Sequence, residues 1–112
     1  MRIEIKGRNV TVGDELRGRI ERRFQKIGKQ VSELAEMEIE LCEERNPSIA
    51  ASQVAEATLR LKGVTLRARE ASDNMVHSIN EVADELTRQV KRHRDKRRKR
   101  RETARAQQPR AA

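Results

Sequence analysis

Every periodic segment of this chain carries its apolar residues on one side only, and this limits how the segments can pack. Ile3 and Ile5 alternate with charged residues, and so do Met37, Ile39 and Leu41. Such alternation predicts strands with one buried and one solvent-facing side. A strand of this kind must bury its apolar face against a second layer of structure.

Two more alternating runs, residues 56–62 and 64–69, meet at Lys62-Gly63. They predict a β-hairpin, because glycine readily adopts the backbone conformation that tight turns require. The segment before them, residues 43–52, contains Asn46-Pro47 and is expected to form a loop.

Two amphipathic helices are predicted by apolar residues that recur every three or four positions. The two stripes are Leu16, Ile20, Phe24, Ile27, Val31 and Leu34, and Met75, Ile79, Val82, Leu86 and Val90. Gly13 or Asp14 is expected to cap the first helix, and Asp73 or Asn74 the second. The predicted order is β-α-β-β-β-α, an α+β fold in which two helices pack on one face of a four-stranded sheet.

The positive charge is concentrated at the end of the chain. Residues 86–112 contain 12 Lys and Arg and 2 acidic residues, whereas residues 1–85 contain 14 and 16. We therefore expect a folded domain over 1–96 and a basic, disordered tail or linker over 97–112. Such a basic run attracts polyanions by releasing their counterions, although a tail that only aids solubility has the same composition.

The first predicted helix also gathers basic residues on one flank. They are Arg19, Arg22, Arg23, Lys26 and Lys29. A helix that is merely solvated usually interleaves both signs, so this flank favours a binding face over a plain solvated one. Two helices on one sheet leave a groove between them, and the second helix is expected to border it with Arg88, Lys91, Arg92 and Lys96. Arg23, Lys26 and Arg92 are all expected to be exposed.

The sequence lacks the residues that most catalytic and ligand-binding sites require. The single aromatic residue, Phe24, excludes platforms that stack unpaired bases and disfavours a deep apolar pocket. His77, His93 and Cys42 are far apart in sequence, and no metal-ligand spacing or phosphate loop is present. The glutamates between residues 36 and 44 are assigned to the solvent face of a strand. We expect no catalytic activity, no cofactor, no metal and no small-molecule substrate.

The location is expected to be cytoplasmic. The N-terminal residues lack the continuous apolar segment of a signal peptide, and no run approaches the roughly 20 apolar residues that cross a bilayer. A single cysteine cannot form an internal disulfide, which fits a reducing compartment. We expect this segment to be monomeric and to have no membrane partner.

A more specific pattern runs from Ala55 to Lys96. Its residues are Glu56, Ala57, Thr58, Leu59, Gly63, Met75, Ile79, Leu86, Arg88, Gln89, Val90 and Arg92. In this order they resemble the ribosome hibernation promoting factors, also called ribosome-associated inhibitors or sigma-modulation proteins. The first helix is similar as well, at Leu16, Arg17, Arg23, Lys26, Ile27 and Lys29. The resemblance covers roughly residues 1–97, and the combined motifs make it specific.

The resemblance implies a fold similar to double-stranded-RNA-binding domains. It also implies binding to the small ribosomal subunit near the decoding centre. There the protein would overlap messenger and transfer RNA and inhibit translation under stress or in stationary phase. The residues implied to bind ribosomal RNA are Arg23, Lys26 and Lys29 on the first helix and Arg88, Arg92 and Lys96 on the second.

Three positions depart from the family pattern. Val76 replaces a tyrosine, Gly13 replaces a threonine cap, and Glu85 replaces a lysine and so removes one expected phosphate contact. Arg22, Lys91 and the basic tail are hypothesised to compensate for Glu85. Fold and charge are also compatible with a general structured-RNA or DNA-binding protein that has no ribosome specificity. The sequence is compatible with a short form of the family and with the N-terminal part of a longer protein. It is also compatible with a protein that promotes the pairing of ribosomes and with one that blocks it.

Overall fold

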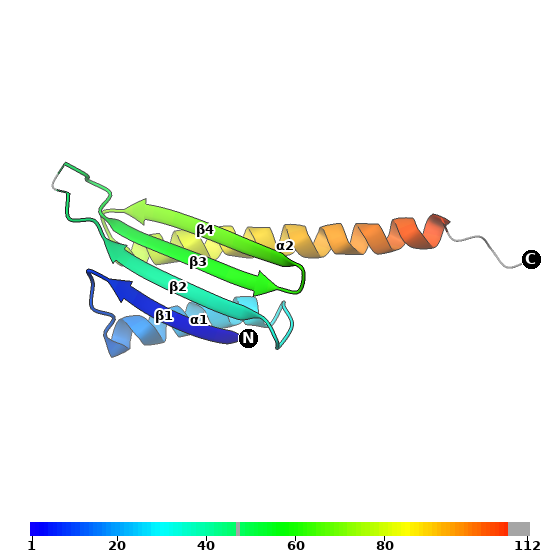
Figure 1. Cartoon of the computed structure of the whole chain (residues 1–112), viewed down its shortest axis with the longest axis horizontal. Coiled ribbons are helices and arrows are strands. Elements are labelled where there is room, and N and C mark those ends of the chain that lie inside the picture. Colours follow the sequence, from blue (N-terminus) through cyan, green and yellow to red (C-terminus); the bar gives the residue numbers. More distant parts are fainter. Residues whose placement is uncertain (47, 108–112) are drawn as a thin grey trace, which may run out of the picture.

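The chain forms a two-layer structure in this computed structural model, which describes residues 1–46 and 48–107. One layer is a four-stranded sheet, and the other consists of two helices on one face of that sheet (Figure 1). The strands are β1 (Arg2–Arg8), β2 (Glu36–Glu43), β3 (Gln53–Leu61) and β4 (Val64–Ser72). The helices are α1 (Asp14–Gly28) and α2 (Met75–Gln107). The predicted α+β class and the order β-α-β-β-β-α are confirmed.

The sheet is mixed and has the order β1-β2-β3-β4. β1 pairs parallel to β2, whereas β3 pairs antiparallel to both β2 and β4. One row of residues lies in register across all four strands: Ile5, Ile39, Ala57 and Ala68. The last three are buried and Ile5 is half-buried, so this row is part of the floor on which the helices pack.

Both helices bury the apolar stripes that the sequence predicts. In α1 the buried residues are Ile20, Phe24 and Ile27, and in α2 they include Ile79, Val82, Leu86 and Val90. All of them belong to one core cluster with the apolar face of the sheet. Because the stripes face the sheet, the charged side chains of both helices are directed outward or sideways.

Local conformations at the chain reversals follow from the residue types. Gly63 has a φ of 80°, a left-handed conformation that glycine adopts without steric strain, and it reverses the chain between β3 and β4. Asn74 caps α2, since its Oδ1 accepts a 3.1 Å hydrogen bond from the backbone N–H of His77. The Oγ of Ser78 then donates to the carbonyl of Gln53 at 2.7 Å and ties the first turn of α2 to β3.

The first helix is shorter than the apolar stripe predicts. It ends at Gly28, so the stripe's last two members, Val31 and Leu34, lie in the loop before β2. Val31 is half-buried, but Leu34 is 90% exposed. The register explains the early end, because Glu36 must pair beside Arg2 at the start of β1. The chain therefore leaves the helix where Gly28 is already level with the side chain of Met1.

The second helix is longer than the burial pattern predicts. It continues to Gln107, so residues 97–107 are helical and the expectation of a disordered tail from residue 97 is wrong for them. Residues 91–107 contain no glycine or proline and are rich in Lys and Arg, which are strong helix formers. The apolar stripe indicated where burial ends, not where the helix ends. The rest of the predicted tail, residues 108–112, lies outside the described residues, and the boundary between domain and tail stays a prediction.

The close approach of β1 to the following turn can be tested with two glycines. Gly7→Ala is expected to lower the free energy of unfolding by about 1–3 kcal/mol, because the added Cβ would lie 2.4 Å from the carbonyl oxygen of Val10. Gly18→Ala is the control, since its Cβ meets only Arg22 Nη1, at 3.4 Å. Alanine's better helix propensity should raise stability there by about 0.5–1 kcal/mol. Chemical denaturation measures both, and effects of the same sign would contradict the close approach.

Candidate nucleic-acid interface

Four basic side chains of α1 and its C-cap are exposed and have no acidic partner among the described residues. They are Arg19, Arg22, Lys26 and Lys29. Within the part of the chain that the structure describes, none of them forms an ion pair. Three of them, Arg22, Lys26 and Lys29, also line a shallow open hollow with Gly18, Glu21 and Gln25. An anionic ligand would therefore meet cations that need not first leave another partner. We call these four residues the α1 flank.

Arg23, the fifth predicted residue of this helix, has a different role. Its Nη2 pairs with Asp84 Oδ1 of α2, so it bridges the two helices. Its side chain is 36% exposed, and its Nε is buried without a hydrogen-bond partner. The expectation that Arg23 is exposed like Lys26 and Arg92 is therefore wrong. Asp84 is exposed on α2, and this ion pair draws Arg23 toward the seam between the helices.

On α2, two of the predicted phosphate-binding arginines share one acidic partner. Arg88 Nη2 lies 2.8 Å from Glu85 Oε2, and Arg92 Nη2 lies 3.3 Å from Glu85 Oε1. Hydrogen bonds from Arg88 first, and then from Gln89, hold the pKa of Glu85 below its ordinary value. The carboxylate therefore stays charged at neutral pH. Glu85 does more than remove a contact, because it also occupies the two neighbouring arginines.

The basic residues of α2 do not all border one groove between the helices. Gln89 Nε2 donates to the carbonyl of Arg67 on β4 at 2.8 Å and to Glu85 at 3.2 Å, so this flank of α2 faces β4. Arg92 also contacts Glu85 there, and Lys96 lies seven residues after Gln89, on the same side of the helix.

Lys91 instead belongs to the side of α2 that faces α1. It lies two helical turns after Asp84, the partner of Arg23 across the seam between the helices. Lys91 is exposed. Of the four α2 residues expected at a groove between the helices, Arg88 and Lys91 lie one and two turns after Asp84, whereas Arg92 and Lys96 lie toward β4.

On the open face of the sheet, several charges are paired across neighbouring strands. Lys6 Nζ lies 3.3 Å from Glu38 Oε1, and Arg60 Nη1 lies 3.4 Å from Glu38 Oε2. The hydrogen bond with Lys6 is the largest cause that lowers the pKa of Glu38, and the same contact raises the pKa of Lys6. The glutamates of β2 thus form part of a balanced solvent face, as the alternation predicts.

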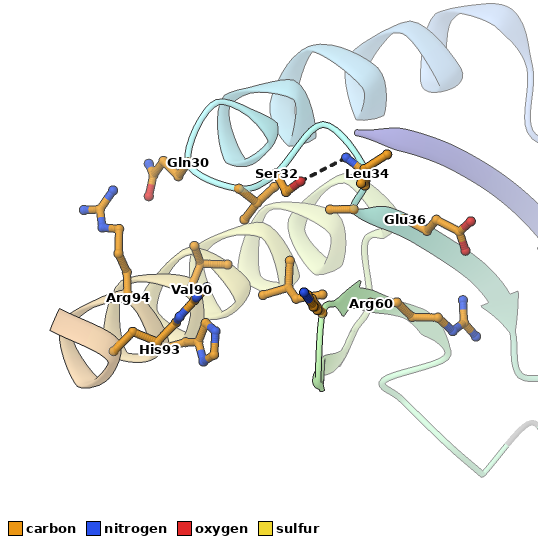
Figure 2. A pocket seen from close by; sticks show the side chains of 13 residues that line it. Gln30, Ser32, Leu34, Glu36, Arg60, Val90, His93 and Arg94 are labelled. Carbon is orange, nitrogen blue, oxygen red and sulfur yellow. Dashed lines mark hydrogen bonds between the residues drawn. The ribbon is translucent and has the colours of Figure 1, made fainter. Parts of the chain in front are cut away.

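One concave surface was not anticipated from the sequence. An open pocket of about 600 Å³ lies between the loop after α1, the end of β3 and α2 (Figure 2). Its apolar walls come from Val31, Leu34, Leu61 and Val90, and its rim carries Arg60, His93, Arg94 and Arg97. The pocket is aliphatic and open at the surface. The spacing of Leu34 assigned it to the first helix, but it lies in the turn after that helix. There its backbone N–H donates a 3.2 Å hydrogen bond to Ser32 Oγ, and its side chain forms part of the pocket wall.

The histidines and the cysteine occupy separate sites. His77 Nε2 lies 2.7 Å from Glu81 Oε1 on an exposed side of α2, His93 lies at the pocket rim, and Cys42 is half-buried on β2. In residues 1–46 and 48–107 no three His, Cys, Asp or Glu side chains are grouped to hold a metal ion. Neither of the described helices is long and apolar enough to cross a membrane.

Comparison with known proteins identifies relatives of this domain. The ribosome hibernation promoting factor of Acinetobacter guillouiae is 29% identical over 99 residues, which cover 84% of this chain and 88% of that protein. The ribosome hibernation promotion factors of Staphylococcus aureus (strain COL) and Picosynechococcus are 31% and 29% identical over 93 and 97 residues. These matches cover 83% and 86% of this chain but 48% and 50% of the relatives, so the chain spans about half of their length.

Two solved structures share the fold. The N-terminal domain of Protein Y from Thermus thermophilus matches with a TM-score of 0.70 and 24% identity, over 83% of this chain and 99% of that one. A ribosomal subunit interface protein from Coxiella burnetii matches with a TM-score of 0.72 and 19% identity, over 85% and 99%. The family model described as sigma 54 modulation protein / S30EA ribosomal protein matches residues 3–98. The resemblance seen in the sequence is thus confirmed, and the chain belongs to the sigma 54 modulation protein / S30EA ribosomal protein family.

Proposed function

We propose that this protein is a ribosome hibernation factor that binds the small ribosomal subunit near the decoding centre and blocks messenger and transfer RNA. The observation that carries the proposal is the α1 flank, whose four cations are exposed and without ion pairs among the described residues. The names of the relatives, ribosome hibernation promoting or promotion factors, support the choice of the ribosome as partner. Inhibition would follow under stress or in stationary phase, in the cytoplasm.

The proposed mechanism is electrostatic and steric and has no chemical step. Arg and Lys side chains bind phosphate oxygens, and arginine does so with two parallel hydrogen bonds. Such contacts position a protein on folded RNA by its shape and carry little base information. Translation stops because the bound domain and the RNA substrates cannot occupy the same channel.

The predicted contact residues fall into three groups by their present partners. Those of the α1 flank, together with Lys91 and Lys96, are ready to bind phosphate. Arg88 and Arg92 must exchange Glu85 for phosphate, which weakens their net contribution. Arg23 is assigned to positioning, because it holds α1 against α2 through Asp84.

Ribosome specificity is tested by co-sedimentation with purified subunits at about 150 mM salt, with duplex RNA as competitor. Pelleting with the small subunit that resists the competitor is the expected result. Equal partition onto any structured RNA or onto DNA would overturn the proposal and identify a general nucleic-acid-binding protein.

The α1 flank is tested by a triple neutralisation, Arg22→Gln, Lys26→Gln and Lys29→Gln. We expect small-subunit affinity to fall about 100-fold, since each charge-assisted contact contributes roughly 1 kcal/mol. The matched control is Arg8→Gln, Arg45→Gln and Arg67→Gln, which removes the same charge from exposed positions outside the helices. Equal losses in the two variants would show that net charge, and not this flank, determines binding. Thermal unfolding checks that both variants remain folded.

Glu85 is expected to act against binding. Glu85→Gln should raise affinity about three- to tenfold, because it removes a negative charge and releases Arg88 and Arg92 for phosphate. Glu56→Gln, whose partner Arg69 lies 3.9 Å away on the open sheet face, is the control for the change in net charge.

The pH dependence of this gain follows from the lowered pKa of Glu85. The lowered pKa keeps the wild-type carboxylate charged to a lower pH than an ordinary glutamate. The difference between Glu85→Gln and wild type should therefore persist at about pH 5 and disappear only in stronger acid, when the wild-type group is protonated as well. Binding titrations across this range measure it, and equal gains from Glu85→Gln and Glu56→Gln would contradict the competition.

A further inference from the structure

The last part of α2 buries little of its surface against the rest of the described chain. Val90 is its last buried residue, and beyond it only His93 is half-buried among residues 91–104. Figure 1 shows the helix continuing past the end of the β3–β4 hairpin and away from the sheet. At 1.5 Å per residue, residues 91–107 extend the helix by about 25 Å. We call residues 91–107 the basic extension.

The basic extension is positively charged on every side. Nine of the eleven residues from Lys91 to Arg101 are Lys or Arg, and the acidic one is Asp95. At 100° per residue their side chains are distributed around the whole helix, whereas the cations of α1 gather on one flank. Asp95 pairs with Arg98 at 3.8 Å, and most of the cations therefore face one another and solvent.

This distribution makes the isolated helix weak. Cations four positions apart, such as Lys96 and Arg100 or Arg97 and Arg101, repel each other across successive turns. A helix of this length without packing is marginal in water even for favourable sequences. A polyanion that surrounds the helix replaces this repulsion with attraction, so binding and helix formation favour each other.

We propose that the basic extension is a second RNA-binding element, which inserts between two RNA backbones and is stabilised as a helix by that contact. A helix that is basic on all sides matches a channel with phosphates on both walls, such as a widened RNA groove or a junction. A membrane surface would bind one face and requires an apolar side, but the only apolar residues here are Ala104 and Ala106. Arginine-rich segments are known to fold on RNA in this way.

This inference goes beyond the proposed function. The family match ends at residue 98, so most of the basic extension lies outside the shared domain. It shares Lys91, Arg92 and Lys96 with the proposed function, but the RNA contacts of residues 97–101, which are all Lys or Arg, need neither the α1 flank nor the small subunit. If the protein proved to have no ribosome specificity, the inference about the basic extension would still hold. If the extension proved not to bind RNA as a helix, the proposed function would still hold.

The test separates helix from charge. Lys99→Gly with Arg100→Gly removes two cations and weakens the helix, whereas Lys99→Ala with Arg100→Ala removes the same cations and preserves it. Both full-length variants are titrated with an RNA duplex that contains an internal loop. We expect the alanine variant to bind several-fold more weakly than wild type, and the glycine variant about tenfold more weakly than the alanine variant. The far-ultraviolet circular dichroism of wild type should gain helix signal as RNA is added.

Three results would overturn the inference. Equal affinities of the glycine and alanine variants would show that the extension binds only as a flexible polycation. An unchanged helix signal on saturation with RNA would show that binding does not stabilise the helix. Binding to vesicles of phosphatidylserine as tight as to RNA, at the same salt, would assign the extension to membranes. The variant with Arg22, Lys26 and Lys29 neutralised should retain the glycine–alanine difference on this RNA, which separates the inference from the proposed function.

Discussion

The burial of two helical stripes on one face of a four-stranded sheet is the constraint on which the remaining structure depends. The chain has one cysteine and one aromatic residue, so neither a disulfide nor an aromatic cluster contributes to this core. Phe24 is fully buried at its centre, surrounded by aliphatic side chains of both layers. Once these stripes face the sheet, the helical period determines which cations point outward. The position of the α1 flank is therefore a consequence of core packing.

Some of the outward-pointing cations form ion pairs with acidic residues of α2, whose positions are also determined by the packing of the core. Asp84 engages Arg23, and Glu85 engages Arg88 and Arg92. These successive acids lie on different sides of α2, so one acts at the seam with α1 and the other on the flank near β4. Among the described residues, the cations of the α1 flank thus have no ion-pair partner, whereas Arg88 and Arg92 of α2 are held by Glu85. An RNA ligand would bind the two helices with unequal strength.

The sequence was sufficient to predict the elements whose signal is local. The β3–β4 hairpin follows from Gly63 and the start of α2 from Asn74, and both are confirmed. Features that depend on the tertiary structure were not predictable in this way. The end of α1 is set by the pairing of Glu36 with Arg2, and the spacing of Leu34 contains no information about that register. Periodicity of burial likewise did not reveal the end of α2, because an unsupported helix has no buried stripe.

The candidate site was predictable by composition and less so by geometry. Counting charges identified the cations of both helices, but their ion-pair partners depend on side-chain placement.

The continuity of α2 has a mechanical consequence. One uninterrupted helix joins the folded domain to the basic extension, with no glycine or proline to act as a hinge. Each residue along this helix lies 1.5 Å further from the folded domain and is rotated by 100° about the helix axis. A contact made by the extension therefore has both its distance from the domain and its direction around the helix fixed by its position in the sequence.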